Sequence, residues 1–257
     1  MTPILEARDL HFSYRDRVVF NKLSFAVNDG DMVALLGANG SGKTTLLSMA
    51  AGLLHPVSGN LRINQREWKS WSRRDLSQFV ALVPQHLELP FSFSVEEIVA
   101  QGRVPHLGRF GALSPHDREI IEHAMREVDV LSLRDRVFTE LSGGERQRVK
   151  IAIGLAQEPK LMLLDEPTLH LDIGRQIELV ELLHRLNQRG ITIVAAIHDL
   201  NVARENFDRA ILLFDHDCIQ GSAEEVVQPE LLERAFSVDA SALRAYFDQR
   251  PATPRGI

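Results

Sequence analysis

A glycine-rich segment at residues 37–45, GANGSGKTT, constrains this chain more than any other stretch. It fits the pattern G-x-x-x-x-G-K-[ST], a loop that follows a strand, opens a helix and wraps around phosphate groups. The preceding residues 32–36 form a short apolar run, which is typical of a buried strand. Apolar residues then recur at helical spacing: Leu46, Leu47, Met49, Ala50 and Leu53. The segment therefore predicts an α/β domain that binds a phosphate-bearing ligand.

Each part of this loop has a chemical role in the pattern. Glycines let backbone N–H groups turn inward around a phosphate without a Cβ clash. The helix start adds its dipole and its unpaired N–H groups. We expect Lys43 to reach the β- and γ-phosphates of a nucleotide and the Thr44 hydroxyl to bind Mg²⁺. The expected phosphate-binding residues are Gly37, Ala38, Asn39, Gly40, Ser41, Gly42, Lys43, Thr44 and Thr45.

The bulk composition limits the function classes that the chain can belong to. Its formal charge of −6 gives no sign of a general nucleic-acid-binding surface. A single cysteine, Cys218, rules out an internal disulfide and is expected to be a small core residue. No apolar run approaches the roughly 20 residues that span a bilayer, and the first residues lack the order of a signal peptide. We expect the chain to work in the cytoplasm, with any membrane attachment made through a partner.

The first third and the last half of the sequence have α/β patterns. Residues 4–36 alternate as strands do, and residues 61–63 and 79–83 predict two more strands. After residue 141 a helix is expected to end before Pro159, followed by a strand at 161–164 and a helix at about 173–188. Residues 191–197 form a continuous apolar, β-branched run, as in a parallel strand buried on both faces. A strand at 211–214, short helices and a frayed tail at 251–257 complete the prediction.

Residues 91–139 differ from both flanks and are predicted to be helical. Ser94 with Glu97 fits a capping box, and Ser114-Pro115 with Asp117 fits a helix start. Residues 102–111, rich in glycine and basic residues, are expected to be a loop between these helices. The block is therefore predicted to be a helical insertion in an α/β domain.

Two carboxylates follow the apolar run at 161–164. Asp165 is placed to hold Mg²⁺, usually through water, because Mg²⁺ keeps much of its hydration. Glu166 lies one residue further, where it could polarise the water that attacks a γ-phosphate. The pair predicts hydrolysis rather than binding alone.

The segment LSGGE at residues 141–145 has two interpretations, which can both hold. Ser142 and Glu145 have the spacing of a capping box, so the segment fits a helix start with no further function. A helix N-terminus with Gly143 and Gly144 also exposes free N–H groups, which form an anion site. A cap needs no second glycine, and two glycines cost backbone entropy, so the segment favours phosphate contact.

The order of five motifs resembles that of an ABC-transporter ATPase subunit over essentially the whole chain: GANGSGKTT, Gln85, LSGGE, LMLLDEP and His198. The resemblance implies a P-loop NTPase fold of class α/β, with a parallel core sheet, an N-terminal antiparallel β subdomain and an inserted helical subdomain. It implies one domain over 1–257. Residues 1–90 and 140–257 would form the nucleotide-binding core, and 91–139 would contact a membrane partner.

The same resemblance implies how ATP is bound. Two copies would form a head-to-tail homodimer around two ATP molecules. Each ATP would lie between the loop of Lys43 in one copy and Ser142, Gly143 and Gly144 of the other. Tyr14 resembles the aromatic residue that stacks on adenine.

The resemblance also implies roles for residues around the γ-phosphate. Gln85 is similar to the glutamine that contacts Mg²⁺ and the attacking water and links the site to the helical block. His198 resembles the switch histidine near the γ-phosphate, and Asp172 the aspartate that communicates across the dimer. The preceding Leu169-His170 departs from the Ser-Ala that is common in the family, so the contacts of those two positions stay open.

Less specific segments between residues 101 and 117 indicate a class within the family. The segments QGRVPH at 101–106, GRF at 108–110 and SPHD at 114–117 resemble ATPases that import iron siderophores, haem and vitamin B12. This class implies ATP, Mg²⁺, membrane permease subunits and, indirectly, a substrate-binding protein, at the cytoplasmic face of the membrane. His106, His116 and His123 lack tight ligand spacing and are expected at an interface or surface. A soluble ATPase of iron–sulfur cluster assembly and an exporter ATPase remain alternatives, and the sequence does not identify the cargo.

Overall fold

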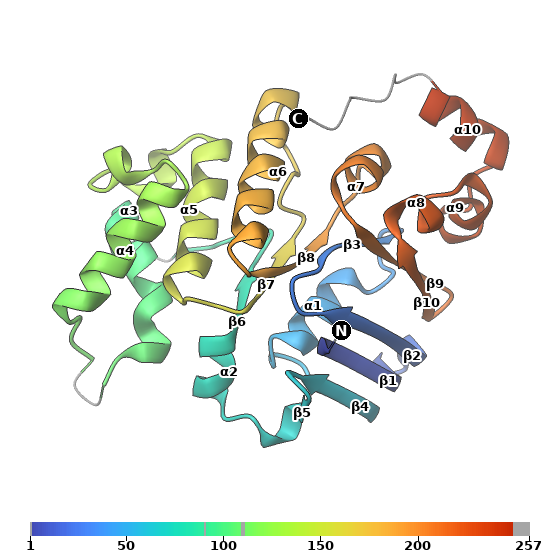
Figure 1. Ribbon diagram of the computed structural model, residues 1–257, viewed down its shortest axis with the longest axis horizontal. Coiled ribbons are helices and arrows are strands. Elements are labelled where there is room, and N and C mark those ends of the chain that lie inside the picture. The colour runs from blue at the N-terminus through green and yellow to red at the C-terminus, as the bar shows by residue number, and fades with distance from the viewer. Residues whose placement is uncertain (1, 90, 109–110, 249–257) are drawn as a thin grey trace.

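The computed structural model describes residues 2–89, 91–108 and 111–248, and these residues build two sheets with helices around them (Figure 1). The larger sheet has the strand order β10-β9-β3-β8-β7-β6, and the smaller one β2-β1-β4-β5. Part of the segment GRF, Arg109-Phe110, and the expected tail at 251–257 lie outside the described residues.

The larger sheet is parallel except at one edge. Its parallel strands are β6 (Val80–Val83), β7 (Leu161–Asp165), β8 (Thr192–Ala196), β3 (Met32–Gly37) and β9 (Arg209–Phe214). The edge strand β10 (Asp217–Ser222) pairs antiparallel with β9 and was not predicted. Every residue of β3, β7 and β8 is buried, as expected of parallel strands that are covered on both faces.

The smaller sheet is antiparallel and is formed by β1 (Pro3–Tyr14), β2 (Arg17–Asn28), β4 (Ser58–Ile63) and β5 (Arg66–Glu67). It packs with helix α1 (Lys43–Ala50) over one face of the larger sheet. Successive residues of β3 face opposite ways, so Val33 and Leu35 join the core on this side. Met32, Ala34 and Leu36 join the core on the other side. The predicted parallel core sheet and N-terminal antiparallel sheet are confirmed.

Helices α3 (Val95–Ala100) and α4 (Pro115–Glu127) lie at one end of the molecule (Figure 1, left). Both begin with the predicted serine caps, because Ser94 accepts from Glu97 N and Ser114 accepts from Asp117 N. Helix α5 (Gly143–Ala156) packs against both of them and against β6. The helical layer therefore continues past residue 139 into the helix that starts with LSGGE.

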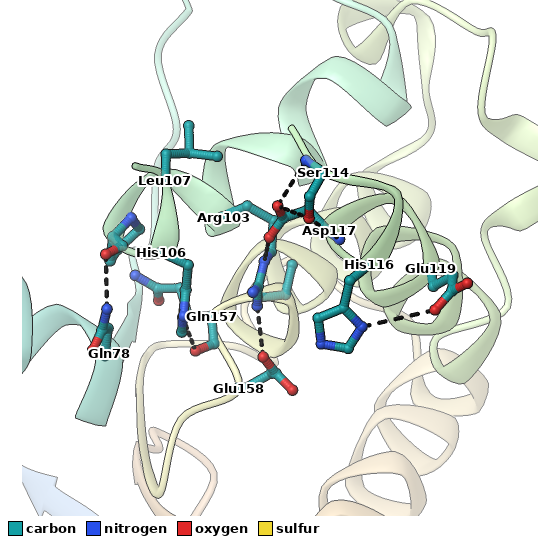
Figure 2. A network of polar contacts seen from close by, with 12 residues as sticks. Gln78, Arg103, His106, Leu107, Ser114, His116, Asp117, Glu119, Gln157 and Glu158 are labelled. Atoms are coloured by element: carbon teal, nitrogen blue, oxygen red, sulfur yellow. Dashed lines mark hydrogen bonds and ion pairs between the residues drawn. The ribbon is translucent and has the colours of Figure 1, made fainter. Parts of the chain in front are cut away.

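A buried arginine joins this helical layer together (Figure 2). Arg103, 3% exposed, donates to Asp117 Oδ1 at 2.9 Å, to Ala156 O at 2.8 Å and to Glu158 Oε2 at 2.7 Å. It thereby links the 3₁₀ helix η2 (Gln101–His106) to the start of α4 and to the end of α5. Two of the segments that carry the importer resemblance, around residues 103 and 117, thus meet through one ion pair.

Four sequence-based expectations need correction. Leu53 lies beyond α1 and is 67% exposed, because the helix ends at Ala50. Residues 102–106 belong to η2 instead of an open loop, because the buried Arg103 holds them. Phe79 ends helix α2 (Arg73–Phe79), which was not predicted and precedes β6. Cys218 is half-buried in edge strand β10, and burial raises the pKa of its thiol to about 12.

The remaining described elements are the helix predicted at about 173–188 and several short helices. They are η1 (Trp68–Ser70), η3 (Leu131–Leu133), η4 (Phe138–Glu140), α6 (Ile173–Gln188), α7 (Leu200–Asn206), α8 (Ala223–Val226), α9 (Pro229–Phe236) and α10 (Ala240–Asp248). Within the described ranges, none of the helices has the length and apolar character that crossing a membrane requires.

Candidate functional site

The candidate site lies where four parallel strands end at one edge of the larger sheet. The loop at 37–45 follows β3, Asp165 ends β7, and His198 follows β8. Gln85 lies two residues after β6. Because parallel strands end at the same edge, residues that are far apart in the sequence converge there, as ligand sites of such sheets generally do.

The backbone of the phosphate loop requires glycine at specific positions. Gly42 has φ 105°, and a Cβ there would lie 2.7 Å from the ring of Phe20. Gly37 has φ 146°, and a Cβ would lie 2.7 Å from the carbonyl oxygen of Leu213. Both distances are shorter than real Cβ contacts, so only glycine fits without movement of the strands beneath the loop.

Lys43 is the first residue of α1 and is only 5% exposed. Its Nζ donates to two carbonyls of its own loop, Gly37 O at 2.7 Å and Ala38 O at 3.3 Å. Burial lowers the pKa of Lys43, while the carboxylates Glu166 and Asp165 act in the opposite direction. Backbone carbonyls hold this ammonium in the loop, where an arriving phosphate would provide a fully charged partner.

Asp165 has the character of a ligand for a hard cation. Its side chain is buried and close to the hydroxyl of Thr44, yet its Oδ1 has no hydrogen-bond partner. Burial raises the pKa of Asp165, and the hydrogen bond from Thr44 opposes that rise. Buried polar atoms are rarely left unsatisfied, and a carboxylate with a hydroxyl is an oxygen donor set that Mg²⁺ prefers. The residues present therefore fit Mg²⁺, and Thr44, Asp165 and Gln85 are the ones that would hold it.

Glu166 is the centre of a hydrogen-bonded chain of three side chains. Gln85 Nε2 donates to Glu166 Oε2 at 2.6 Å, and His198 Nε2 lies 2.5 Å from Glu166 Oε1. Glu166 has φ 51°, in the left-handed region that costs a non-glycine residue free energy. The fold thus holds this carboxylate in a strained backbone position, with one polar partner on each oxygen.

Tyr14 lies beside the phosphate loop. Its ring is 49% exposed and rests edge-on against Phe12, with the ring centres 4.9 Å apart. Its hydroxyl is 3.4 Å from Thr45 Oγ1. An exposed aromatic ring fixed next to a phosphate site suits stacking on a planar base.

The segment at 142–144 is the predicted helix start of α5. Ser142 and Glu145 form the complete capping box, and these hydrogen bonds lower the pKa of Glu145. A Cβ at Gly143 would meet nothing within 4 Å, so packing inside this chain does not explain the glycine. Across the described residues, no hydrogen bond or ion pair joins 142–144 to the loop at 37–45. Gly143 instead lines an open cavity of about 390 Å³ with Gln85 and Glu166.

Asp172 caps helix α6, where its Oδ1 accepts from Arg175 N at 3.0 Å. Apolar side chains beside it are exposed, with Ile173 at 69% and Ile177 at 53%. This helix start therefore presents an uncovered apolar surface next to a charged cap.

Lys150 is a residue of the site that the sequence did not single out. It is buried in α5, and its Nζ donates to the carbonyls of Pro84 and Gln85. A lysine on the polar side of a helical pattern normally indicates solvent exposure, so only the packing of α5 against β6 identifies it.

Comparisons with known proteins show which family the chain resembles in sequence. The family model described as ABC transporter matches residues 20–169. The iron(3+)-hydroxamate import ATP-binding protein FhuC of Bacillus subtilis is 39% identical, over 92% of this chain and 88% of the relative. The ferric enterobactin transport ATP-binding protein FepC of Escherichia coli is 36% identical, over 91% and 87%. The hemin import ATP-binding protein HmuV of Rhodopseudomonas palustris is 37% identical, over 93% and 92%.

A solved structure gives the same result for the fold. The chain is similar to an inward-facing conformation of a putative metal-chelate type ABC transporter, with a TM-score of 0.83 and 32% identity. The alignment covers 93% of this chain and 90% of the solved one. On its motifs, its fold and these similarities, the chain belongs to the ABC transporter family.

Proposed function

We propose that this chain is the ATP-hydrolysing subunit of a membrane importer of an iron chelate, a siderophore or haem, or of cobalamin. The observation that carries the ATPase activity is the chain of Gln85, Glu166 and His198 at the edge that also holds the phosphate loop. The names of three relatives support the iron-chelate cargo, because they refer to iron(3+)-hydroxamate import, ferric enterobactin transport and hemin import.

The proposed chemistry assigns one task to each group. Glu166 accepts the proton of the attacking water. Gln85 and His198 hold the Glu166 carboxylate in position relative to the γ-phosphate. Lys43 and the loop N–H groups bind the phosphates, and Tyr14 stacks on the adenine. Mg²⁺, when bound by Thr44 and Asp165, would neutralise charge on the β- and γ-phosphates.

A second copy completes each site in this proposal. Within the described residues, Ser142, Gly143 and Gly144 make no hydrogen bond to their own phosphate loop, and Gly143 has no neighbour in its own chain that requires a glycine. In a head-to-tail homodimer this helix start would contact the γ-phosphate bound by the partner subunit. ATP then draws two copies together, and hydrolysis removes the charge that holds them.

The proposal assigns the residues at 91–139 to a permease-facing subdomain and 1–90 with 140–257 to the nucleotide-binding core. Integral membrane permease subunits would attach the chain to the cytoplasmic face of the membrane. A substrate-binding protein would act on the far side and select the cargo.

A pull-down tests this function. Tagged Glu166→Gln chain is recovered in mild detergent from its native membranes with ATP and Mg²⁺, and copurifying proteins are identified. We expect an apolar, multi-span partner, whose binding protein is then screened with siderophores, haem and cobalamin. Recovery of soluble partners alone would contradict import and favour a cytosolic ATPase, such as one for iron–sulfur cluster assembly.

A further inference from the structure

Lys150 is a buried cation that contacts the loop of Gln85 and no nucleotide-binding residue. It is 9% exposed, and its Nζ lies 3.1 Å from Pro84 O and 2.7 Å from Gln85 O. In the part of the chain that the structure describes, it forms no ion pair within 4 Å. Two backbone carbonyls are therefore what satisfies this ammonium.

Such a lysine is costly for the fold. Burial and, to a smaller extent, the nearby charge of Arg146 together lower the pKa of Lys150 to about 8. An apolar side chain of similar length would fill the same space between α5 and β6 without that desolvation. The role of a lysine at this position is therefore to hold the backbone of Pro84 and Gln85, whose carbonyls accept its hydrogen bonds.

The two carbonyls belong to the backbone that carries Gln85. The same residue that accepts from Lys150 through its carbonyl donates to Glu166 Oε2 through its side chain, at 2.6 Å. Lys150 thereby fixes the backbone from which the amide reaches the carboxylate. Because Lys150 lies two turns after Ser142 on the same helix, α5 carries both this anchor and the LSGGE end.

From this geometry we infer that Lys150 is a positioning residue for ATP hydrolysis. It holds the Gln85 side chain against Glu166, and because Lys150 belongs to α5, a movement of α5 would also move Gln85. The inference rests on the proposed ATPase function. Lys150 does not touch the phosphate loop, so its contribution is to turnover and not to nucleotide affinity.

The first test separates turnover from binding. Lys150→Met removes the donors and keeps the length of the side chain. We expect kcat for ATP hydrolysis by the full chain to fall by about 10- to 100-fold, because a misplacement of about 1 Å in a reacting group can cost that much. The Kd for ATP, measured with a fluorescent ATP analogue, stays within about twofold. Lys160→Met, at an exposed lysine, is the matched control and keeps the wild-type rate.

A double-mutant cycle distinguishes positioning from a general structural effect. Gln85→Ala removes the side chain through which Lys150 acts, so Lys150→Met should cause no further loss of kcat in that background. Equal losses in both backgrounds, or an unchanged kcat in the single variant, would overturn the inference. If Lys150→Met does not fold, Lys150→Gln takes its place in the same cycle, because its amide keeps N–H donors but lies on a shorter, uncharged side chain.

The outcomes for Lys150 and for the proposed function remain distinct. Wild-type chain that binds no ATP, or hydrolyses none, would contradict the ATPase function itself. Active wild-type chain with additive Lys150 and Gln85 effects would contradict the role of Lys150 alone.

Discussion

At the scale of single residues, the site depends on charged groups that the fold buries. Lys43 and Asp165 are both buried. Burial lowers the pKa of Lys43 and raises the pKa of Asp165, and both shifts favour the neutral form of the side chain. Glu166 is held from both sides by Gln85 and His198. A phosphate and a divalent cation would each satisfy a group that the chain leaves only partly satisfied.

Replacement of Lys43 by alanine should weaken nucleotide binding. The loss of charged hydrogen bonds to the phosphates corresponds to about 1.5–3 kcal/mol, or roughly 10- to 100-fold in Kd. Titration with ATP, followed by calorimetry, measures this change, with Lys160→Ala as the control at an exposed lysine. An unchanged Kd would argue against the phosphate role of Lys43.

Replacement of Glu166 by glutamine should separate binding from hydrolysis. The amide keeps the size of the side chain and loses the base, so hydrolysis is expected to fall by ~10²–10⁴-fold while ATP still binds. Phosphate release and equilibrium ATP binding are measured on the same preparation. Equal turnover in variant and wild type would remove Glu166 from the role of general base.

At the scale of elements, Arg103 joins η2 to α4 through its ion pair with Asp117, and to the end of α5 through its hydrogen bond to Ala156 O (Figure 2). Hydrogen bonds from Ser114 and then the Arg103 guanidinium hold the pKa of Asp117 at about 2. Because the pKa in the folded state is below its unfolded value, the stabilisation is present above about pH 4. It is lost as the pH falls toward 2.

Asp117→Asn should therefore destabilise the chain in a pH-dependent way. At pH 7 we expect a loss of about 1.5–3 kcal/mol in the free energy of unfolding, because the buried Arg103 loses one of its two charged partners and keeps only Glu158. Urea unfolding at several pH values should show this difference shrink between pH 4 and pH 2. Asp135→Asn, at an exposed carboxylate of the same region, serves as control. A difference that does not vary with pH would contradict the charge-based explanation.

Sequence patterns predicted the elements whose local signals agree with their environment. The caps at Ser94, Ser114 and Ser142 form as their spacing requires, because each cap is completed within four residues. Strand β10 was missed because it depends on pairing with β9, which no local pattern reports. Helix α2 was missed although it has a local signal, since the Ser72 side chain accepts from Asp75 N as a helix cap.

The candidate site shows the same division between local and distant contacts. Motif order predicted that Gln85, Asp165, Glu166 and His198 lie together, since each lies at or just after the end of a parallel strand. The buried Lys150 and Arg103 could not be predicted, because charged residues within helices usually face solvent. Their partners are carbonyls and carboxylates between 14 and 66 positions away in the sequence.

At the scale of the whole molecule, the loop at 37–45 and the helix start at 142–144 share no hydrogen bond or ion pair within the described residues of one chain. The cavity that includes Gly143 contains no residue of the loop at 37–45. The exposed apolar residues Ile173 and Ile177 beside Asp172 form a surface that a second copy could cover. A monomer of this fold would therefore bind ATP without enclosing it.

The molecular mass of Glu166→Gln chain with and without ATP and Mg²⁺ tests this arrangement most directly, measured by light scattering after size exclusion. We predict a mass near that of one chain without ATP and near twice that value with it. Adding Ser142→Arg to the same chain should keep ATP binding and abolish the doubling, because it blocks the helix start that contacts the partner's nucleotide. Saturated ATP binding with the mass of a single chain would contradict an ATP site completed by a second copy.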